Sequence, residues 1–173
     1  MRSALSSLLV AAVSLVLASA DLTACGDKYI RLAARLGPGY VAEHSANVLI
    51  FMPPNSAVPS AARKIGLHDS LKRAGHHVSA ITRESDLEAA LTAGRYDIVV
   101  ADAASAEALA PMLQRAPGRP TLLPVYDRMS AAELKKERRE QRCLIASRER
   151  AYHAVAEIDH VMQLRSTAGN AIP

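Results

Sequence analysis

The stretch Arg95-Tyr96-Asp97-Ile98-Val99-Val100-Ala101-Asp102 decides the fold of this chain. It is a short apolar run, rich in β-branched residues, that ends on a carboxylate. Such a run is typical of a central strand that a parallel sheet buries on both faces. Asp102 would then stand at the carboxyl end of the strand, where open α/β sheets build their binding sites.

Strand-like and helix-like segments alternate on both sides of this run. Further strands are expected at 48–52, 77–81, 121–125 and 142–146, and helices at 59–74, 85–93, 105–113, 130–141 and 147–165. Turn residues such as those of Pro53-Pro54-Asn55 separate the segments. Strands that are each followed by a helix through short connections predict an α/β fold with a five-stranded, doubly wound parallel sheet. We expect this domain to span 47–166 and to be followed by a disordered tail, 167–173.

The composition narrows the possible partners. The chain of 173 residues has a formal net charge of +4, one Phe, no Trp and five Tyr. Because aromatic rings are the platforms on which unpaired bases stack, this scarcity argues against the binding of single-stranded nucleic acid, and we expect no nucleic-acid partner. The modest positive charge suits contact with an anionic envelope surface as well as with nucleic acid.

The first 24 residues predict a signal peptide for export. Arg2 provides the positive start, and 4–20 is an uncharged run rich in Leu, Val and Ala. Two cleavage patterns compete: Ala18-Ser19-Ala20 suits ordinary signal peptidase, and Leu22-Thr23-Ala24-Cys25 resembles the lipobox of bacterial lipoproteins. The lipobox predicts a periplasm-facing protein of the bacterial cell envelope, lipid-anchored at Cys25.

Two alternatives to the lipid anchor stay open. In the first, the protein is soluble and secreted or periplasmic, and a disulfide between Cys25 and Cys143 becomes possible in an oxidising compartment. In the second, the N-terminal apolar run is retained as a membrane anchor. In each case the segment 25–46, with Gly37-Pro38-Gly39 and no sustained period, is predicted to be a tether.

The order of elements and the run Tyr96-Asp97-Ile98-Val99-Val100-Ala101-Asp102 resemble the receiver domain of two-component response regulators, which has a flavodoxin-like fold. The resemblance covers 47–165 and implies that Asp102 is equivalent to the phosphoacceptor. It also implies a contact face formed by the fourth helix, the fifth strand and the last helix. In this chain the fourth helix and the residues just after it carry a cationic cluster, which is the candidate partner face. Its members are Lys135, Lys136, Arg138, Arg139 and Arg142.

The groups that receivers use with their phosphoacceptor are replaced in this chain. Met52 and Pro53 stand where receivers have an acidic pair that holds Mg²⁺. Val125 or Tyr126 stands where they have Thr or Ser, and Ala146 where they have Lys. Phosphoryl transfer depends on positioning and charge neutralisation, so we expect Asp102 to be inactive.

Other candidate sites have plain structural interpretations beside them. His153, Glu157 and His160 share a sector of the last helix at a spacing that zinc could use, but the apolar stripe opposite predicts a plain polar outer face. No phosphate loop, nucleophile elbow or paired-carboxylate motif is present. We expect no catalytic residues, metal or cofactor.

The sequence thus predicts a non-catalytic protein-interaction module at the bacterial cell envelope. Its partner would be an envelope protein or the anionic membrane surface. The alternative is a small-ligand-binding domain that uses the crevice at the carboxyl ends of the strands, near Pro54, Asp102 and Tyr126.

Overall fold

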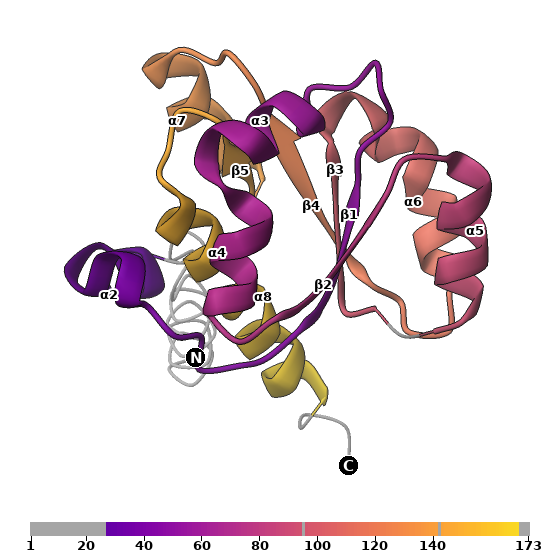
Figure 1. Cartoon of the computed structure of the whole chain (residues 1–173), viewed down its shortest axis with the longest axis horizontal. Coiled ribbons are helices and arrows are strands. Elements are labelled where there is room, and N and C mark those ends of the chain that lie inside the picture. The colour runs from indigo at the N-terminus through magenta and orange to yellow at the C-terminus, as the bar shows by residue number, and fades with distance from the viewer. Residues whose placement is uncertain (1–26, 95, 142, 170–173) are drawn as a thin grey trace, which may run out of the picture.

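The computed structural model describes residues 27–94, 96–141 and 143–169, which form an α/β fold around one sheet (Figure 1). The five strands are all parallel: β1 Asn47–Phe51, β2 His77–Ile81, β3 Ile98–Asp102, β4 Thr121–Tyr126 and β5 Ile145–Ala146. Their order in the sheet is β2-β1-β3-β4-β5. This order is that of flavodoxin-like folds, and it confirms the predicted fold class.

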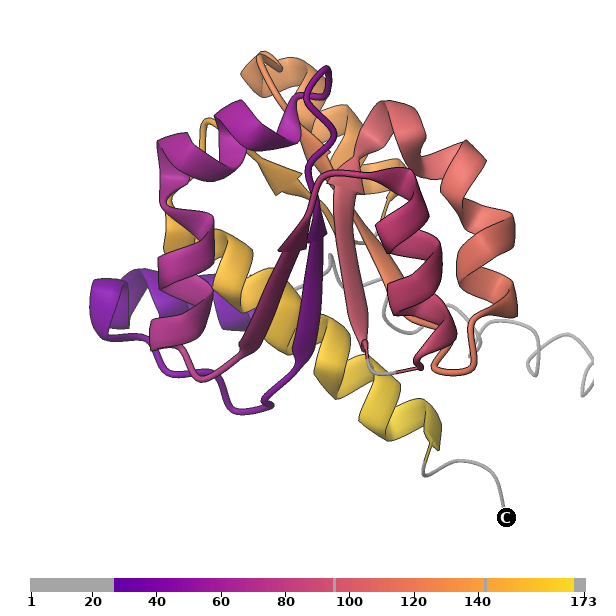
Figure 2. The same ribbon diagram turned by 45° about the vertical axis from the view of Figure 1, so that its right-hand side comes forward.

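Helices cover both faces of the sheet (Figure 2). One face carries α3 Val58–Ile65, α4 Leu67–Arg73 and α8 Ala151–Gly169. The other carries α5 Glu84–Thr92 and, after the 3₁₀ turn η2 Ala103–Ser105, α6 Ala106–Arg115. The helix α7 Ala131–Glu140 lies beside β5 at the edge of the sheet.

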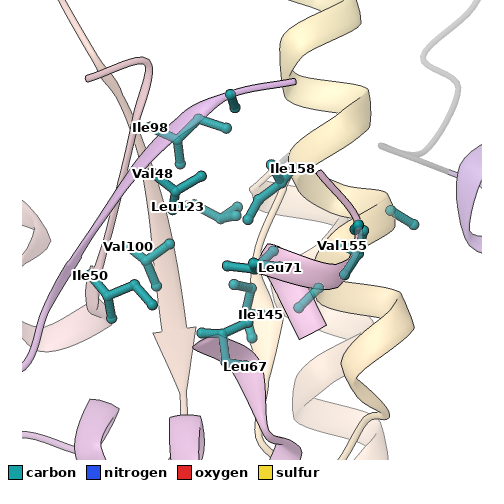
Figure 3. Close-up of a cluster of buried hydrophobic side chains, with 14 of the residues drawn as sticks. Val48, Ile50, Leu67, Leu71, Ile98, Val100, Leu123, Ile145, Val155 and Ile158 are labelled. Carbon is teal, nitrogen blue, oxygen red and sulfur yellow. The ribbon is translucent and has the colours of Figure 1, made fainter. Parts of the chain in front are cut away.

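Alternation of side chains along the central strands divides the core into two layers. Val48, Ile50, Ile98 and Val100 pack with α4 and α8, as Figure 3 shows. Their sequence neighbours Leu49, Phe51, Val99 and Ala101 face α5 and α6. All eight are buried, and β3 is a central strand of the sheet, as the apolar run ending at Asp102 predicts.

The expected single helix 59–74 is two helices in the structure. Gly66, at φ +59°, ends α3 in the left-handed conformation, and α4 begins at the next residue. Glycine reaches this conformation without a steric penalty, so the backbone can break at Gly66. The apolar residues keep a helical spacing on both sides of the break, which is why the sequence predicts one helix.

The last strand and the last helix both differ from expectation. The strand expected at 142–146 is reduced to Ile145–Ala146, and the helix expected from Ser147 begins at Ala151. Ser147 instead donates its hydroxyl to Asp127, which fixes the intervening turn. The C-terminal helix also runs to Gly169, into the part predicted as a tail.

The segment predicted as a tether is folded in its described part. Helix α2 Asp27–Leu36 and the turn η1 Gly37–Gly39 precede β1, and α2 packs against α8. Ala33, Tyr40 and Ala46 are buried in the core layer that contains α8. The predicted signal peptide and Cys25 lie outside the described residues. Among the helices that are described, none combines the length and hydrophobicity needed to span a bilayer.

Candidate functional site

The carboxylate of Asp102, the predicted phosphoacceptor equivalent, holds two backbone segments together. Its Oδ1 accepts the N–H of Ala104 at 3.0 Å and so caps η2. Its Oδ2 accepts the N–H of Ala57 at 2.6 Å, in the loop between β1 and α3. Both oxygens are therefore bonded to the backbone at the carboxyl edge of the sheet.

Apolar residues surround Asp102 in the neighbouring strands. Val125 is level with it in β4 and is 1% exposed. Ala146, in β5, is equally buried. Met52 follows β1, and its N–H donates to the carbonyl of Ile81 at 2.8 Å. Met52, Val125 and Ala146 therefore place no charged side chain at these three positions.

Asp127 is a second carboxylate at this edge that the sequence analysis missed. It follows β4 directly, and its Oδ1 accepts the hydroxyl of Ser147. Its Oδ2 accepts from Nε of Arg128 at 3.2 Å and from Ser60 at 3.4 Å. The hydrogen bond from Ser147 is the main cause that lowers the pKa of Asp127. Its position after a strand end is the same signal that drew attention to Asp102.

Asp102 and Tyr126, two of the residues expected around a ligand-binding crevice, make hydrogen bonds to different parts of the chain. The hydroxyl of Tyr126 bonds Glu137 at 3.2 Å and accepts from Gln141, so this side chain is tied to α7 and its C-terminal end. Burial, and then the charge of Glu137, raise the pKa of Tyr126. Asp102 is tied to Ala57 instead, and Pro54 is exposed.

Helix α7 presents part of the predicted cationic face. A capping box starts the helix: Ser130 accepts from the N–H of Glu133, whose carboxylate accepts from the N–H of Ser130. Leu134 is the one buried residue of α7 and packs on Leu144 and Ala146. Three cations of the predicted cluster are exposed: Lys135, Lys136 and Arg139.

Arg138 is a correction to that cluster, because it is part of the α7–α8 contact. Its guanidinium donates to Glu157 and, through Nη2, to both oxygens of Glu149 at 3.1 and 2.9 Å. Its side chain is 23% exposed. Arg138 therefore joins α7 to the start of α8 instead of facing a partner, and Arg142 lies outside the described residues.

The polar outer face predicted for His153, Glu157 and His160 is also wrong. Glu157 is 1% exposed, because Arg138 of α7 closes over it. Burial raises the pKa of Glu157 to about 7 against the opposing effect of Arg138. In the described part of the chain, no three His, Cys, Asp or Glu side chains are placed to hold a metal ion.

Asp159, which sequence reasoning did not single out, fixes the N-terminal segment onto α8. It is fully buried, and its Oδ2 accepts the hydroxyl of Tyr40 and the N–H of Glu43. Its Oδ1 accepts both the N–H and Nδ1 of His44, at 2.8 and 3.0 Å. Asp159 directly follows the buried Ile158, and adjacent residues of a helix point in different directions. The burial of both side chains therefore means that α8 is covered on more than one side.

Cys143 is half-buried directly before Leu144 and packs against the core layer of α8. It is disulfide-bonded. Among the described residues, Cys143 is the sole cysteine.

Comparisons with protein-family models, with curated proteins and with solved structures found no match for this chain. The function of this chain is therefore inferred from its own residues, above all from the two hydrogen bonds of Asp102 and the exposed cations of α7.

Proposed function

We propose that this protein is a non-catalytic, receiver-like interaction module that is exported to the bacterial cell envelope. The observation that carries the proposal is the bonding of Asp102, whose two oxygens accept the N–H groups of Ala57 and Ala104. A carboxylate used in this way serves as a structural link between loops. To act as a phosphoacceptor, one of these oxygens would have to attack the phosphoryl donor in line, in competition with its hydrogen bond to the backbone.

The surroundings of Asp102 support the same conclusion. A transferred phosphoryl group needs cations around it, and the residues nearest in register are Val125 and, one step on, Tyr126 and Ala146. Incubation with acetyl phosphate and Mg²⁺ should therefore leave the intact mass of the protein unchanged. A stoichiometric phosphate adduct at Asp102 would contradict the proposal.

The partner face that we propose is the exposed side of α7, formed by Lys135, Lys136 and Arg139. Lys136 has a weak ion pair with Glu140 at 3.9 Å, and such exposed pairs are easily exchanged for contacts with a partner. Exposed charges contribute orientation and association rate more than affinity. We infer a weak, salt-sensitive contact with an acidic envelope protein.

Charge reversal tests this face. In the variant Lys135→Glu, Lys136→Glu, Arg139→Glu, all three side chains are exposed, so the fold should persist. Crosslinking in cells should no longer recover the acidic partner with this triple variant. The matched control reverses three exposed cations elsewhere, Lys64→Glu, Lys72→Glu and Arg115→Glu, with the same change in net charge.

Three results are possible. If the α7 variant recovers the same crosslinked proteins as the control, the partner face is elsewhere. If only binding to vesicles of anionic phospholipid is lost, the partner is the membrane surface. Loss of protein crosslinks in the α7 variant alone supports the proposal.

Export is supported by the disulfide of Cys143, because disulfides persist in oxidising compartments such as the periplasm. The mature protein would then be a periplasm-facing envelope protein. A lipid anchor at Cys25 requires that the sulfur of Cys25 carries the lipid and does not form a disulfide with Cys143.

A further inference from the structure

A cavity of about 360 Å³ lies where three separate parts of the chain meet, and none of its described lining residues belongs to α7. Its walls come from 34–40 of α2 and η1, from 65–73 around the break between α3 and α4, and from 150–155 at the start of α8. This volume is in the range of small-molecule sites in proteins.

The charged groups that line this cavity are cationic. Arg73 and Arg150 are the charged residues of the lining, and no carboxylate is among the described residues that form it. Nη2 of Arg73 donates to the hydroxyl of Ser70 at 3.1 Å. Neither arginine has a carboxylate within ion-pair distance in the part of the chain that the structure describes. Both guanidinium groups are thus available to an anion.

The remaining wall is largely apolar. Ala34, Pro38, Ile65 and Val155 line it, together with the ring of Tyr152. The cavity therefore offers an apolar surface beside a cationic one. Guanidinium groups bind carboxylates and phosphates through paired hydrogen bonds, so the chemistry of the lining specifies the charge of the ligand.

We propose that this cavity binds a small organic anion, with a phosphate or carboxylate group held by Arg73 and Arg150 and an apolar body against Ile65 and Val155. Ala151, the first residue of α8, also lines the cavity, and the positive end of a helix dipole favours an anion there. The segment 34–40 closes one side, so an occupant contacts both this segment and the sheet domain.

The probe for this site is phenyl phosphate, which combines the two features. We expect saturable binding in an NMR titration of the purified protein, with the largest amide shifts at Gly66, Ala151 and Tyr152. Phenol, which lacks the charge, should bind at least tenfold more weakly, and so should inorganic phosphate, which lacks the apolar body. 3-Phenylpropionate should compete with phenyl phosphate.

Substitutions separate this site from general electrostatic attraction. Arg73→Gln and Arg150→Gln should each weaken phenyl phosphate binding at least tenfold, and the control Arg115→Gln on α6 should leave it unchanged. Ala34→Glu places a carboxylate in the cavity and should also abolish binding, whereas Leu36→Glu, on the same helix but outside the lining, should not.

Specific results would overturn the proposal. Equal affinity for phenol would mean that the arginines do not bind the anion, and equal affinity for inorganic phosphate would mean that the apolar wall is not used. Shifts centred away from the cavity, or an equal loss in Arg115→Gln, would exclude this site. Arg73 and Arg150 are exposed, so their variants remain folded and each outcome can be read.

Discussion

Asp159 of α8 and Tyr40, which lie 119 residues apart in the sequence, are joined by a buried hydrogen bond from the phenol to the carboxylate. The same carboxylate accepts three further hydrogen bonds, from Glu43 and twice from His44. One acidic side chain thus orders the segment that leads into β1. Segment 40–44 is held in place by hydrogen bonds as well as by apolar packing.

Asp159→Asn should destabilise the protein by about 2 to 4 kcal/mol, because the amide NH2 group replaces one of the two carboxylate oxygens and leaves the donors of that oxygen without an acceptor. Tyr40→Phe removes one of the bonds and should cost about 1 kcal/mol. Urea unfolding measures both losses, and limited proteolysis near Val41, which is 68% exposed, should accelerate. The control is Asp86→Asn, which removes an exposed pair with Arg83. Equal losses of stability in Asp159→Asn and the control would show that the hydrogen bonds of Asp159 to 40–44 contribute no stability.

The sheet could be predicted from the sequence because its signals are local. The apolar run that ends at Asp102 and the repeated strand–helix pattern depend on side chains within one element. Asp159 could not be predicted in the same way, since its partners lie at 40–44 and come together only when α8 is covered on both sides.

Arg138 and Glu157 illustrate the same limit at the candidate site. A run of alternating charges on α7 is typical of a solvated helix, and Lys135, Lys136 and Arg139 are indeed exposed. Which cation of the run turns inward depends on the position of α8, which the sequence of α7 does not contain. The burial of Glu157 follows from that tertiary contact.

Glu157 should make stability fall as the pH rises. Burial raises its pKa in the folded protein from 4.5 to about 7, so the folded state holds a proton that the unfolded state has lost between these values. The resulting loss is on the order of 3 kcal/mol, complete above pH 7 and absent below pH 4.5. We expect the stability of the native protein minus that of Glu157→Gln to decrease by this amount from pH 4.5 to 7.5.

This difference isolates Glu157 from the other titratable groups around it, Glu149 and His153, and from Arg138. Unfolding in urea at a series of pH values gives both stabilities. A difference that rises with pH would contradict the prediction, and it would mean that the attraction of Arg138 exceeds the cost of burying the carboxylate.

His76 should make stability fall as the pH falls, which is opposite to the effect of Glu157. It is 4% exposed, and neither ring nitrogen has a hydrogen-bond partner in the part of the chain that the structure describes. Burial lowers the pKa of His76, although Asp159 opposes this effect and His77 adds to it. The folded state therefore disfavours protonation, and stability is lost as the pH falls below 6.5.

His76→Phe keeps the ring volume and removes the titration. We expect this variant to become progressively more stable than the native protein as the pH falls from about 7.5 to 5, measured by urea unfolding. The exposed neighbour provides the control, His77→Gln. If the stability gap between His76→Phe and the native protein does not change with pH, His76 takes up no proton on unfolding.

The two cysteines distinguish the two forms of the proposed exported protein, one with a lipid anchor at Cys25 and one that is soluble in the periplasm. Cys143 is disulfide-bonded, and the chain has one other cysteine, Cys25. A lipid on Cys25 occupies the same sulfur that a disulfide within the chain would use, so the two modifications exclude one another.

We expect the disulfide and a soluble periplasmic protein. The mass of the mature protein should then be lower by two hydrogen atoms before reduction than after it. Cys25→Ser and Cys143→Ser should each cost about 2 to 5 kcal/mol of stability and expose the remaining thiol to alkylation. Incorporation of a labelled fatty acid, with Cys143 reactive as a free thiol in the native protein, would instead establish the lipid anchor at Cys25.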